Sequence, residues 1–404
     1  MGRGTQYAPL VREALTGLSR EEARARYEAL PLPTTSDESW RFTDLAGFDP
    51  DSFSRDGASV APAPRSALDI DAAGIAIVTE SGIRIERQPE GVTFAPLGGH
   101  PDLGALVGAD EKFAAHNAAE WENGLLVAAR PGVVLDKPLY VRIVSSTGGA
   151  LFWRLLVEAM EESRFTVIEE YVSASPETAA YTNAAVELFV RDAAKVEYVS
   201  LQNLSRETWH FGSHRARVER DAELDWVAGG FGSKKGKTRI ENDLAGTGAT
   251  SRVTGAYFAD SSQHLDYDTL QEHLAPNTTS DFAFKGALRE RATAVWRGMI
   301  RVAEAAQRTN AYQENRNLLL SPRAHADSIP GLEIQANDVR CTHGATVGQV
   351  DREQLFYLMS RGLTRAEAER LIVRGFFTDV LDRIELDPVR EALGSLLEAR
   401  IPVA

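Results

Sequence analysis

One short stretch of the chain combines the two side chains best suited to soft-metal or sulfur chemistry. Cys341, the single cysteine of the sequence, stands two residues before His343, and small residues flank the pair. A thiolate and an imidazole both bind iron or zinc, and a thiolate is also a sulfur nucleophile. In an extended segment, residues two apart project to the same side, so both side chains could reach one ion or one cluster.

The pair alone does not complete a site. Iron–sulfur clusters usually take four ligands, so the remaining ligands would come from another chain or from a distant residue. The alternative is structural, with Cys341 as a small buried residue beside a hydrogen-bonded histidine. The residue types leave both interpretations open.

Other histidines are spaced so that an extended chain could bring them to one face. His210 and His214 are four residues apart, and His264 and Asp266 precede His273. Either group could bind zinc. In a β-rich region such residues are more often surface or hydrogen-bonded positions, which is the interpretation we favour.

The segment Gly230-Phe-Gly-Ser-Lys-Lys-Gly236-Lys237-Thr238 resembles a phosphate-binding loop in composition but not in spacing. That loop has four residues before its Gly-Lys-Ser/Thr and leads into a helix whose N–H groups meet the phosphates. Here five residues separate the two outer glycines, and the residues after Thr238 are typical of strand and turn. We therefore expect an exposed, lysine-bearing turn and no ATP bound by this chain.

The composition is that of an ordinary globular protein, with 404 residues, 43% hydrophobic and 25% charged. The net charge of −14 argues against nucleic acid or an anionic membrane as the main partner. The sequence has no apolar run long enough to span a membrane and no apolar signal core. A single cysteine cannot form an internal disulfide, so a cytoplasmic location is expected.

Helical patterns lie at the two ends of the chain. Apolar residues at helical spacing between residues 8 and 29, with Ser19 and Glu22 as a capping box, predict N-terminal helices. A loop rich in Pro, Ser and Asp follows up to Ser66. After Asp351, Thr364 and Glu367 form a second capping box, and Asp387-Pro388 predicts an N-cap and the start of the last helix.

The C-terminal helical pattern carries a wide apolar stripe. One row consists of Ile372, Phe376, Val380 and Ile384, and the row beside it of Val373, Phe377 and Leu381. Packing on the body of the protein is the simplest explanation of this stripe. The alternative is a helix that docks on a partner protein.

Between residues 75 and 334 the pattern is one of short β-rich runs separated by Gly, Asn, Asp and Ser. The clearest runs are 133–144, 165–172, 186–190, 196–201 and 224–227, and a short helix is expected at 110–122. Such runs predict a mainly β body, which could be a sandwich, a barrel or a β-solenoid. No clean short repeat chooses among the three. The expected division is an N-terminal helical region with linker (1–66), a β core (67–350) and a C-terminal helical module (351–404).

Several motifs together resemble the SufB/SufD scaffold family of iron–sulfur cluster assembly. The resemblance is dense from about residue 255 to 381, and its motifs are Gln263–Thr269 with His273, Ser280–Gly286, Gln307–Ser321, Leu332–Gly348, Asp351–Leu358 and Ser360–Phe376. Asp37-Glu-Ser-Trp-Arg-Phe-Thr-Asp-Leu45 is similar to an N-terminal motif of SufD-type members. Gly344 stands where SufB-type members typically carry a glutamate, which also favours the SufD type.

The resemblance implies a right-handed parallel β-helix core between N- and C-terminal helical regions. It implies a non-enzymatic subunit that pairs through its core with a SufB-like chain. The C-terminal module would dock on a SufC-like ABC ATPase, and the candidate docking residues are Leu355, Phe356, Ile372, Phe376 and Val380. His343, and less strongly Cys341, would lie at the SufB–SufD interface, where iron enters and a transient cluster forms.

The implied mechanism is mechanical. ATP-driven dimerisation of the SufC-like subunits would pull on the C-terminal modules and open the interface, while sulfur would arrive through SufB from a cysteine desulfurase. The isolated chain could form a homodimer, and the resemblance leaves flavin use by the complex open. Two other classes of function remain to be weighed. One is a solenoid enzyme acting on polysaccharides, and the other is a structural protein whose self-association does not depend on Cys341 or His343.

Overall fold

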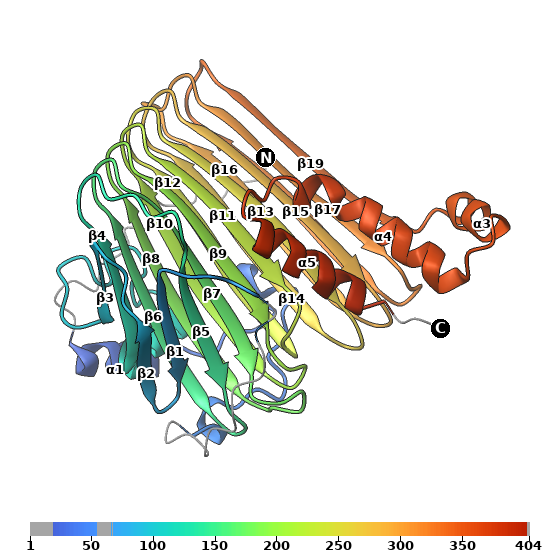
Figure 1. Ribbon diagram of the computed structural model, residues 1–404, viewed down its shortest axis with the longest axis horizontal. Helices are drawn as coiled ribbons and strands as arrows, with labels where there is room; N and C mark the ends of the chain where they lie inside the picture. Colours follow the sequence, from blue (N-terminus) through green and yellow to red (C-terminus); the bar gives the residue numbers. More distant parts are fainter. Residues whose placement is uncertain (1–18, 55–65, 67, 402–404) are drawn as a thin grey trace, which may run out of the picture.

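The computed structural model describes residues 19–54, 66 and 68–401, which form a parallel β-solenoid with helices on its outside (Figure 1). The strands are β1 (Gly74–Thr79), β2 (Gly82–Arg87), β3 (Val92–Pro96), β4 (Asn123–Ala129), β5 (Leu139–Ser145), β6 (Ala150–Ala159), β7 (Arg164–Ser173), β8 (Tyr181–Val190), β9 (Lys195–Asn203), β10 (Trp209–Val218), β11 (Glu223–Gly230), β12 (Lys235–Leu244), β13 (Thr250–Ala259), β14 (His264–His273), β15 (Thr279–Leu288), β16 (Thr293–Val302), β17 (Asn310–Leu319), β18 (His325–Ile334) and β19 (Arg340–Gln349). The helices are α1 (Arg20–Ala29), α2 (Lys112–Glu120), α3 (Arg352–Ser360), α4 (Arg365–Leu381) and α5 (Asp387–Ala399), with 3-10 turns at Glu38–Trp40 and Pro50–Ser52.

Successive strands alternate between two sheets. The ten-stranded sheet has the order β19-β17-β15-β13-β11-β9-β7-β5-β1-β2, and the nine-stranded sheet has the order β18-β16-β14-β12-β10-β8-β6-β4-β3. All pairs are parallel except β1 with β2 and β3 with β4, which are antiparallel. Each coil therefore contributes one strand to each sheet. Among the three architectures compatible with the β pattern, the solenoid is confirmed.

The interior between the sheets is filled by large side chains at alternating strand positions. Trp153, Trp226 and Trp296 are fully buried there, within one continuous apolar cluster. Because the two sheets face each other, each strand needs only one apolar side toward the interior. The other side faces outward, where helices cover part of it.

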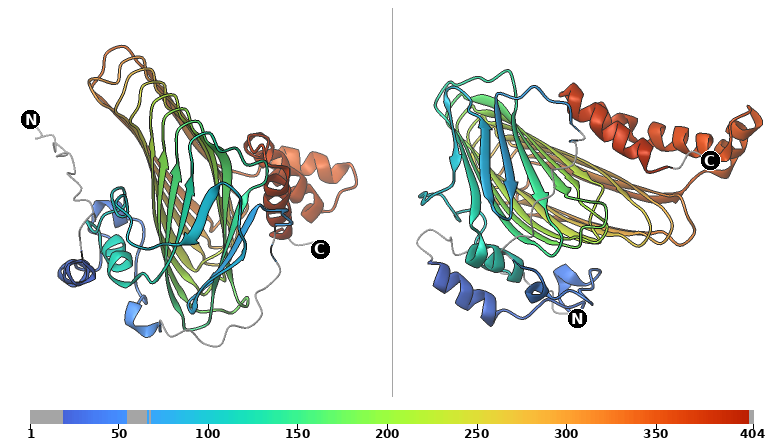
Figure 2. Two further views of the ribbon diagram at one scale, coloured as in Figure 1. Left: turned by 60° about the vertical axis from the view of Figure 1, so that its left-hand side comes forward. Right: turned by 60° about the horizontal axis from the view of Figure 1, so that its bottom comes forward.

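The helices cover the two sheets separately (Figure 2). Helices α4 and α5 pack on the outer side of the ten-stranded sheet, with Phe377 and Leu393 against Val227 and Phe258. On the opposite side, α2 and the segment around Phe48 pack on the nine-stranded sheet. The expected flanking helical regions are thus present, and no helix within the described residues is long and apolar enough to cross a membrane.

Most of the predicted helix boundaries are confirmed. Ser19 and Thr364 both complete their capping boxes, at the starts of α1 and α4. The helix expected at 110–122 is α2. Asp387 is the first residue of α5 rather than its N-cap, which is Leu386. The run 133–144 is not one strand, since β5 starts only at Leu139. Residues 8–18 of the first helical pattern lie outside the described part of the chain.

A carboxyl group is buried inside the solenoid without a cation beside it. Glu169 on β7 is fully buried, and it accepts hydrogen bonds from Trp153 Nε1 at 2.5 Å, from the Tyr171 hydroxyl at 3.3 Å and from the Tyr198 hydroxyl. Burial disfavours the charged form and raises the pKa of Glu169 to about 7, although the three hydrogen bonds partly oppose this shift.

We expect Glu169→Gln to change the pH dependence of stability. In the folded state, Glu169 keeps its proton up to about pH 7, whereas in the unfolded chain it releases the proton near its ordinary pKa of 4.5. Between pH 4.5 and pH 7 the folded state therefore binds more protons than the unfolded state, and this group makes the free energy of unfolding fall as pH rises. The drop in unfolding free energy between pH 5 and pH 8 should be smaller in Glu169→Gln, by on the order of 3 kcal/mol. Urea unfolding at both pH values measures it, with the exposed Glu86→Gln as control. Equal pH dependence in all three proteins would contradict the assignment.

Candidate functional site

The solenoid ends at β18 and β19, each of which is the last strand of its sheet. Within the described chain, β18 is paired only with β16, and β19 only with β17. Each strand therefore has one edge of backbone N–H and C=O groups without a strand partner (Figure 1). Such an edge is a template for pairing with another chain.

The two edges differ in what they offer. On β19, the N–H groups of Arg340 and Val350 donate toward β17, so by alternation those of residues 341, 343, 345, 347 and 349 face the open side. On β18, the N–H groups of His325 and Gln335 donate toward β16, which places Pro330 among the residues that face outward. Proline has no N–H, so the open edge of β18 lacks a hydrogen-bond donor at its centre. A partner strand is therefore better accommodated beside β19.

The apolar interior is incompletely covered at this end. Leu332 and Ile334 on β18 are in register with the fully buried Ile300 and Val302 on β16, yet they are 38% and 40% exposed. Val347 on β19 is 42% exposed. These residues occupy interior positions of a coil that no further coil covers, which is typical of a protein interface.

Cys341 and His343 lie on β19 at this open end. They are in register with the buried residues Ala311 and Gln313, so both are on the interior-facing side of the last coil. His343 is exposed, whereas Cys341 is partly buried against a small apolar cluster that includes Ile300. The strand register thus confirms the prediction that Cys341 and His343 project to the same face.

The environment of Cys341 favours the protonated thiol. Burial raises the pKa of Cys341 above its usual value, so less thiolate is present at neutral pH. A protonated thiol is a poor nucleophile and a poor metal ligand. Of the two residues, His343 is therefore the better placed to bind an iron that arrives at this surface.

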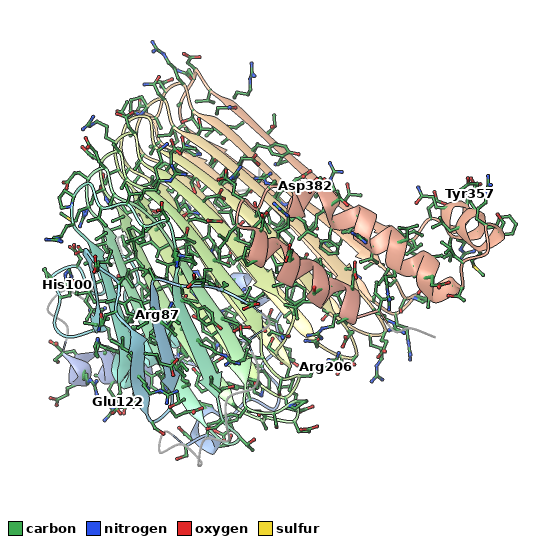
Figure 3. All side chains as sticks on the ribbon, viewed as in Figure 1. Arg87, His100, Glu122, Arg206, Tyr357 and Asp382 are labelled. Atoms are coloured by element: carbon green, nitrogen blue, oxygen red, sulfur yellow. The ribbon has the colours of Figure 1, made fainter. Side chains whose placement is uncertain are left out.

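No three-ligand site includes these two residues within residues 19–54, 66 and 68–401. The one group there that brings three potential ligands together consists of His100, Asp102 and Glu158, at the β3 end of the solenoid (Figure 3). Arg191 already contacts both of its carboxylates, at 2.8 Å and 3.5 Å. A cluster at Cys341 and His343 would thus need ligands from another chain.

The other histidines singled out from the sequence, at positions 210, 214, 264 and 273, are buried in the solenoid. His210 and His214 share a face of β10, but both are buried, and residues four apart on a strand are about 13 Å apart. Burial lowers their pKa values to about 4 and about 3. Both ring nitrogens of His264 bond to threonine hydroxyls, and those of His273 bond to Thr and Ser hydroxyls. The geometry thus does not support a shared zinc at either group.

The glycine-rich segment is a turn between two strands, as expected, and it is exposed at Lys234 but otherwise mostly buried. It connects β11 to β12, so a strand rather than a helix follows it. Phe231 and Ser233 are fully buried, and Lys237 is buried in an ion pair with Asp266 at 2.7 Å. The expected exposure therefore holds for Lys234 but not for most of the turn, which packs within the stack of coils.

The N-terminal segment that resembles a SufD-type motif attaches to this same region. Thr43 is hydrogen-bonded to His264 and Asp266, and the Lys237 ammonium lies 5.3 Å from the centre of the Trp40 ring. The motif thus fixes the N-terminal segment to the outer side of β12 and β14. Its residues are structural in this chain.

The structure divides the candidate docking residues into three groups. Val380 and Leu355 are 1% and 8% exposed, so they are not accessible to a partner. Ile372 and Phe376 are partly buried against the ten-stranded sheet. Phe356 on α3 is 73% exposed.

Phe356 belongs to a larger apolar surface that the sequence pattern did not single out. Tyr357, Met359 and Leu371 are also among the exposed large apolar residues of α3 and α4. Helix α3 projects away from the sheets, with Tyr357 on its outside (Figure 3). We call these four residues the α3 patch. The apolar rows in the sequence of α4 mark the side of that helix that packs on the sheet. They therefore indicated the buried Val380 and not the exposed residues of this patch.

Comparison with known proteins agrees with this architecture. The family described as "SUF system FeS cluster assembly, SufBD core domain" matches residues 142–376. An iron–sulfur cluster assembly SufBD family protein of Mycobacterium tuberculosis is 30% identical over 409 residues, covering 98% of this chain and 97% of the relative. The iron–sulfur cluster assembly protein SufB of Bacillus subtilis is 32% identical over 269 residues, covering 66% of this chain and 58% of SufB. The chain therefore belongs to the SufBD family of iron–sulfur cluster assembly proteins.

Proposed function

We propose that this chain is a SufD-type scaffold subunit, itself not an enzyme, that works with a SufB-type chain and a SufC-type ABC ATPase. The observation that carries the proposal is the open end of the solenoid. There, unpaired strand edges, half-exposed Leu332, Ile334 and Val347, and the exposed His343 lie together. A SufB-type chain placed against this end would cover the apolar residues and supply the missing ligands of the nascent cluster.

Gly344 supports the SufD type. It lies beside Glu314 on the neighbouring strand, and a Cβ added there would meet its nearest atoms at 3.8 Å, which is ordinary contact. The backbone thus leaves room for the glutamate of SufB-type members. That glutamate would project from β19 on the side opposite to His343, so its absence removes a carboxylate from the outer side of the open end, and the partner carries more of the cluster chemistry.

The α3 patch is the proposed ATPase-docking surface, and α4 links it to the solenoid. Lys285 on β15 forms an ion pair with Asp379 of α4, and Arg383, just after α4, contacts Asp281 at 3.2 Å. Val380 and Phe377 are buried on the same sheet. Movement of a docked ATPase would therefore be transmitted to β15 and β13, which are two and three strands from the edge at β19.

The experiment that tests the pairing is co-expression with SufB-type and SufC-type chains, using Leu332→Asp as the disruptive variant. A charge placed on a surface that a partner buries should weaken the SufB-type complex roughly thirtyfold or more. Leu274→Asp is the matched control, since Leu274 is 39% exposed and directly follows β14, two strands in from the edge strand β18. Retention of the SufB-type chain by Leu332→Asp as well as by the control would exclude this end as the pairing surface.

A further inference from the structure

A row of charged residues crosses the outer side of the nine-stranded sheet and stops at its edge. Asp243 on β12, Glu272 on β14, Arg301 on β16 and Glu333 on β18 occupy directly neighbouring register positions. Arg215 on β10 joins the row from its start, contacting Asp243 at 2.8 Å and Glu272 at 3.5 Å. The row thus spans five strands and ends where the solenoid ends.

Within the row, Glu272 is placed between two arginines, whereas Glu333 at the edge contacts only one. Glu272 contacts Arg215 on one side, and on the other it accepts a hydrogen bond from Arg301 at 3.2 Å. Glu333 accepts one from Arg301 at 3.1 Å, and Arg301 is already shared with Glu272. On its outer side, Glu333 has no neighbouring strand in the described chain.

Exposure rises along the row toward the edge. The side chain of Asp243 is 6% exposed and that of Glu272 18%, whereas that of Glu333 is 38% exposed. A chain placed against the open end would bury Glu333 as the inner carboxylates are buried. Glu333 shares its one cation, Arg301, with Glu272, so a covering chain that supplies a second cation beside Glu333 is favoured over one that does not.

We infer that the partner at the open end presents an arginine or lysine beside Glu333, extending the charge row by one member across the interface. This inference rests on the proposed pairing with a SufB-type chain and names the chemistry that selects that partner. Strand β18 itself contains no lysine or arginine. A second copy of this chain that paired β18 with β18 would therefore bring carboxylates, not a cation, from that strand.

The test is a titration of the SufB-type chain with the full-length wild type and with Glu333→Gln, Glu333→Arg and Glu86→Arg. Glu86 is a matched control because its side chain is 40% exposed, is ion-paired at 2.7 Å to Arg84, and lies on β2, the edge strand at the other end of the solenoid. Glu333→Gln should weaken binding roughly fivefold and Glu333→Arg at least about tenfold, with Glu86→Arg unchanged. The salt dependence of wild-type binding should diminish in Glu333→Gln.

A rescue experiment adds specificity. Arg→Glu or Lys→Glu substitutions along the partner's edge strands should include one that restores binding to Glu333→Arg. Circular dichroism melts identify a variant that fails to fold, and Glu333→Gln, which keeps the side-chain shape, remains informative in that case.

The outcomes separate the two claims. Absence of binding by the wild type overturns the proposed pairing itself. If the wild type binds, and the three variants Glu333→Gln, Glu333→Arg and Glu86→Arg bind with the same affinity, the inference alone is overturned. A dimer of wild type with Glu333→Arg that is tighter than either homodimer would identify a second copy as the occupant and also overturn it.

Discussion

Replacing His343 by alanine should lower the iron–sulfur cluster content of the assembled complex roughly tenfold or more, while the complex stays intact. His343 is exposed on the interior-facing side of β19, at an end whose apolar residues form the rest of the contact surface. Removing the imidazole deletes a ligand for incoming iron without removing that apolar surface. The measurement is iron and acid-labile sulfide per complex after anaerobic purification.

His325→Ala is the matched control for this variant. His325 lies at the same end, on the outer side of β18, with its side chain 66% exposed. It should leave the cluster content unchanged. Cys341→Ser should have a smaller effect than His343→Ala, because burial keeps that thiol protonated. Equal cluster content in His343→Ala and His325→Ala would remove His343 from the chemistry and assign it to the SufB-type chain.

Replacing Phe356 by aspartate should weaken binding of the SufC-type ATPase roughly thirtyfold or more. Phe356 is 73% exposed and is the most exposed residue of the α3 patch, where a buried interface would desolvate the introduced charge. Because the side chain contributes little to the fold, the variant should melt like the wild type. Titration of the ATPase, followed by its stimulated ATP hydrolysis, measures the effect.

Val134→Asp provides the control for Phe356→Asp, since Val134 is 59% exposed and lies before β5, far along the chain from α3. Phe376→Asp is less informative. Phe376 packs against the sheet, and the Lys285 ammonium lies 4.8 Å from its ring, so that variant would disturb the attachment of α4. Unchanged ATPase affinity in Phe356→Asp would show that the ATPase docks elsewhere.

The sequence narrowed the β body to a sandwich, a barrel or a solenoid, but its periodicity could not choose among these three folds. Successive coils differ in length, since positions in register are 26 residues apart between β10 and β12 but 32 residues apart between β16 and β18. The residues in the left-handed conformation at the turns also vary in type, among them Glu162, Asp221, Asn277 and Arg308. A repeat of variable length and variable turn residue leaves no short pattern to detect, so the family resemblance was needed.

The functional site was predictable in part. Alternation along an extended segment correctly placed Cys341 and His343 on one face. Their position at an open end was not predictable, because it depends on which strand has no neighbour, and pairing is non-local. For the same reason, the stripe on α4 suggested docking by Val380, which the sheet covers. Phe356 was among the candidates that the resemblance gave, but its high exposure and the exposed Tyr357 beside it could not be read from the sequence.

The measurement that tests the central claim most directly is native mass spectrometry of the anaerobically co-purified complex, with iron and sulfide analysis, in the presence and absence of this chain. We expect one assembly that contains this chain, a SufB-type chain and a SufC-type ATPase, with a cluster whose yield falls when this chain is omitted. Full cluster yield without this chain, or the absence of this chain from any such assembly, would contradict it.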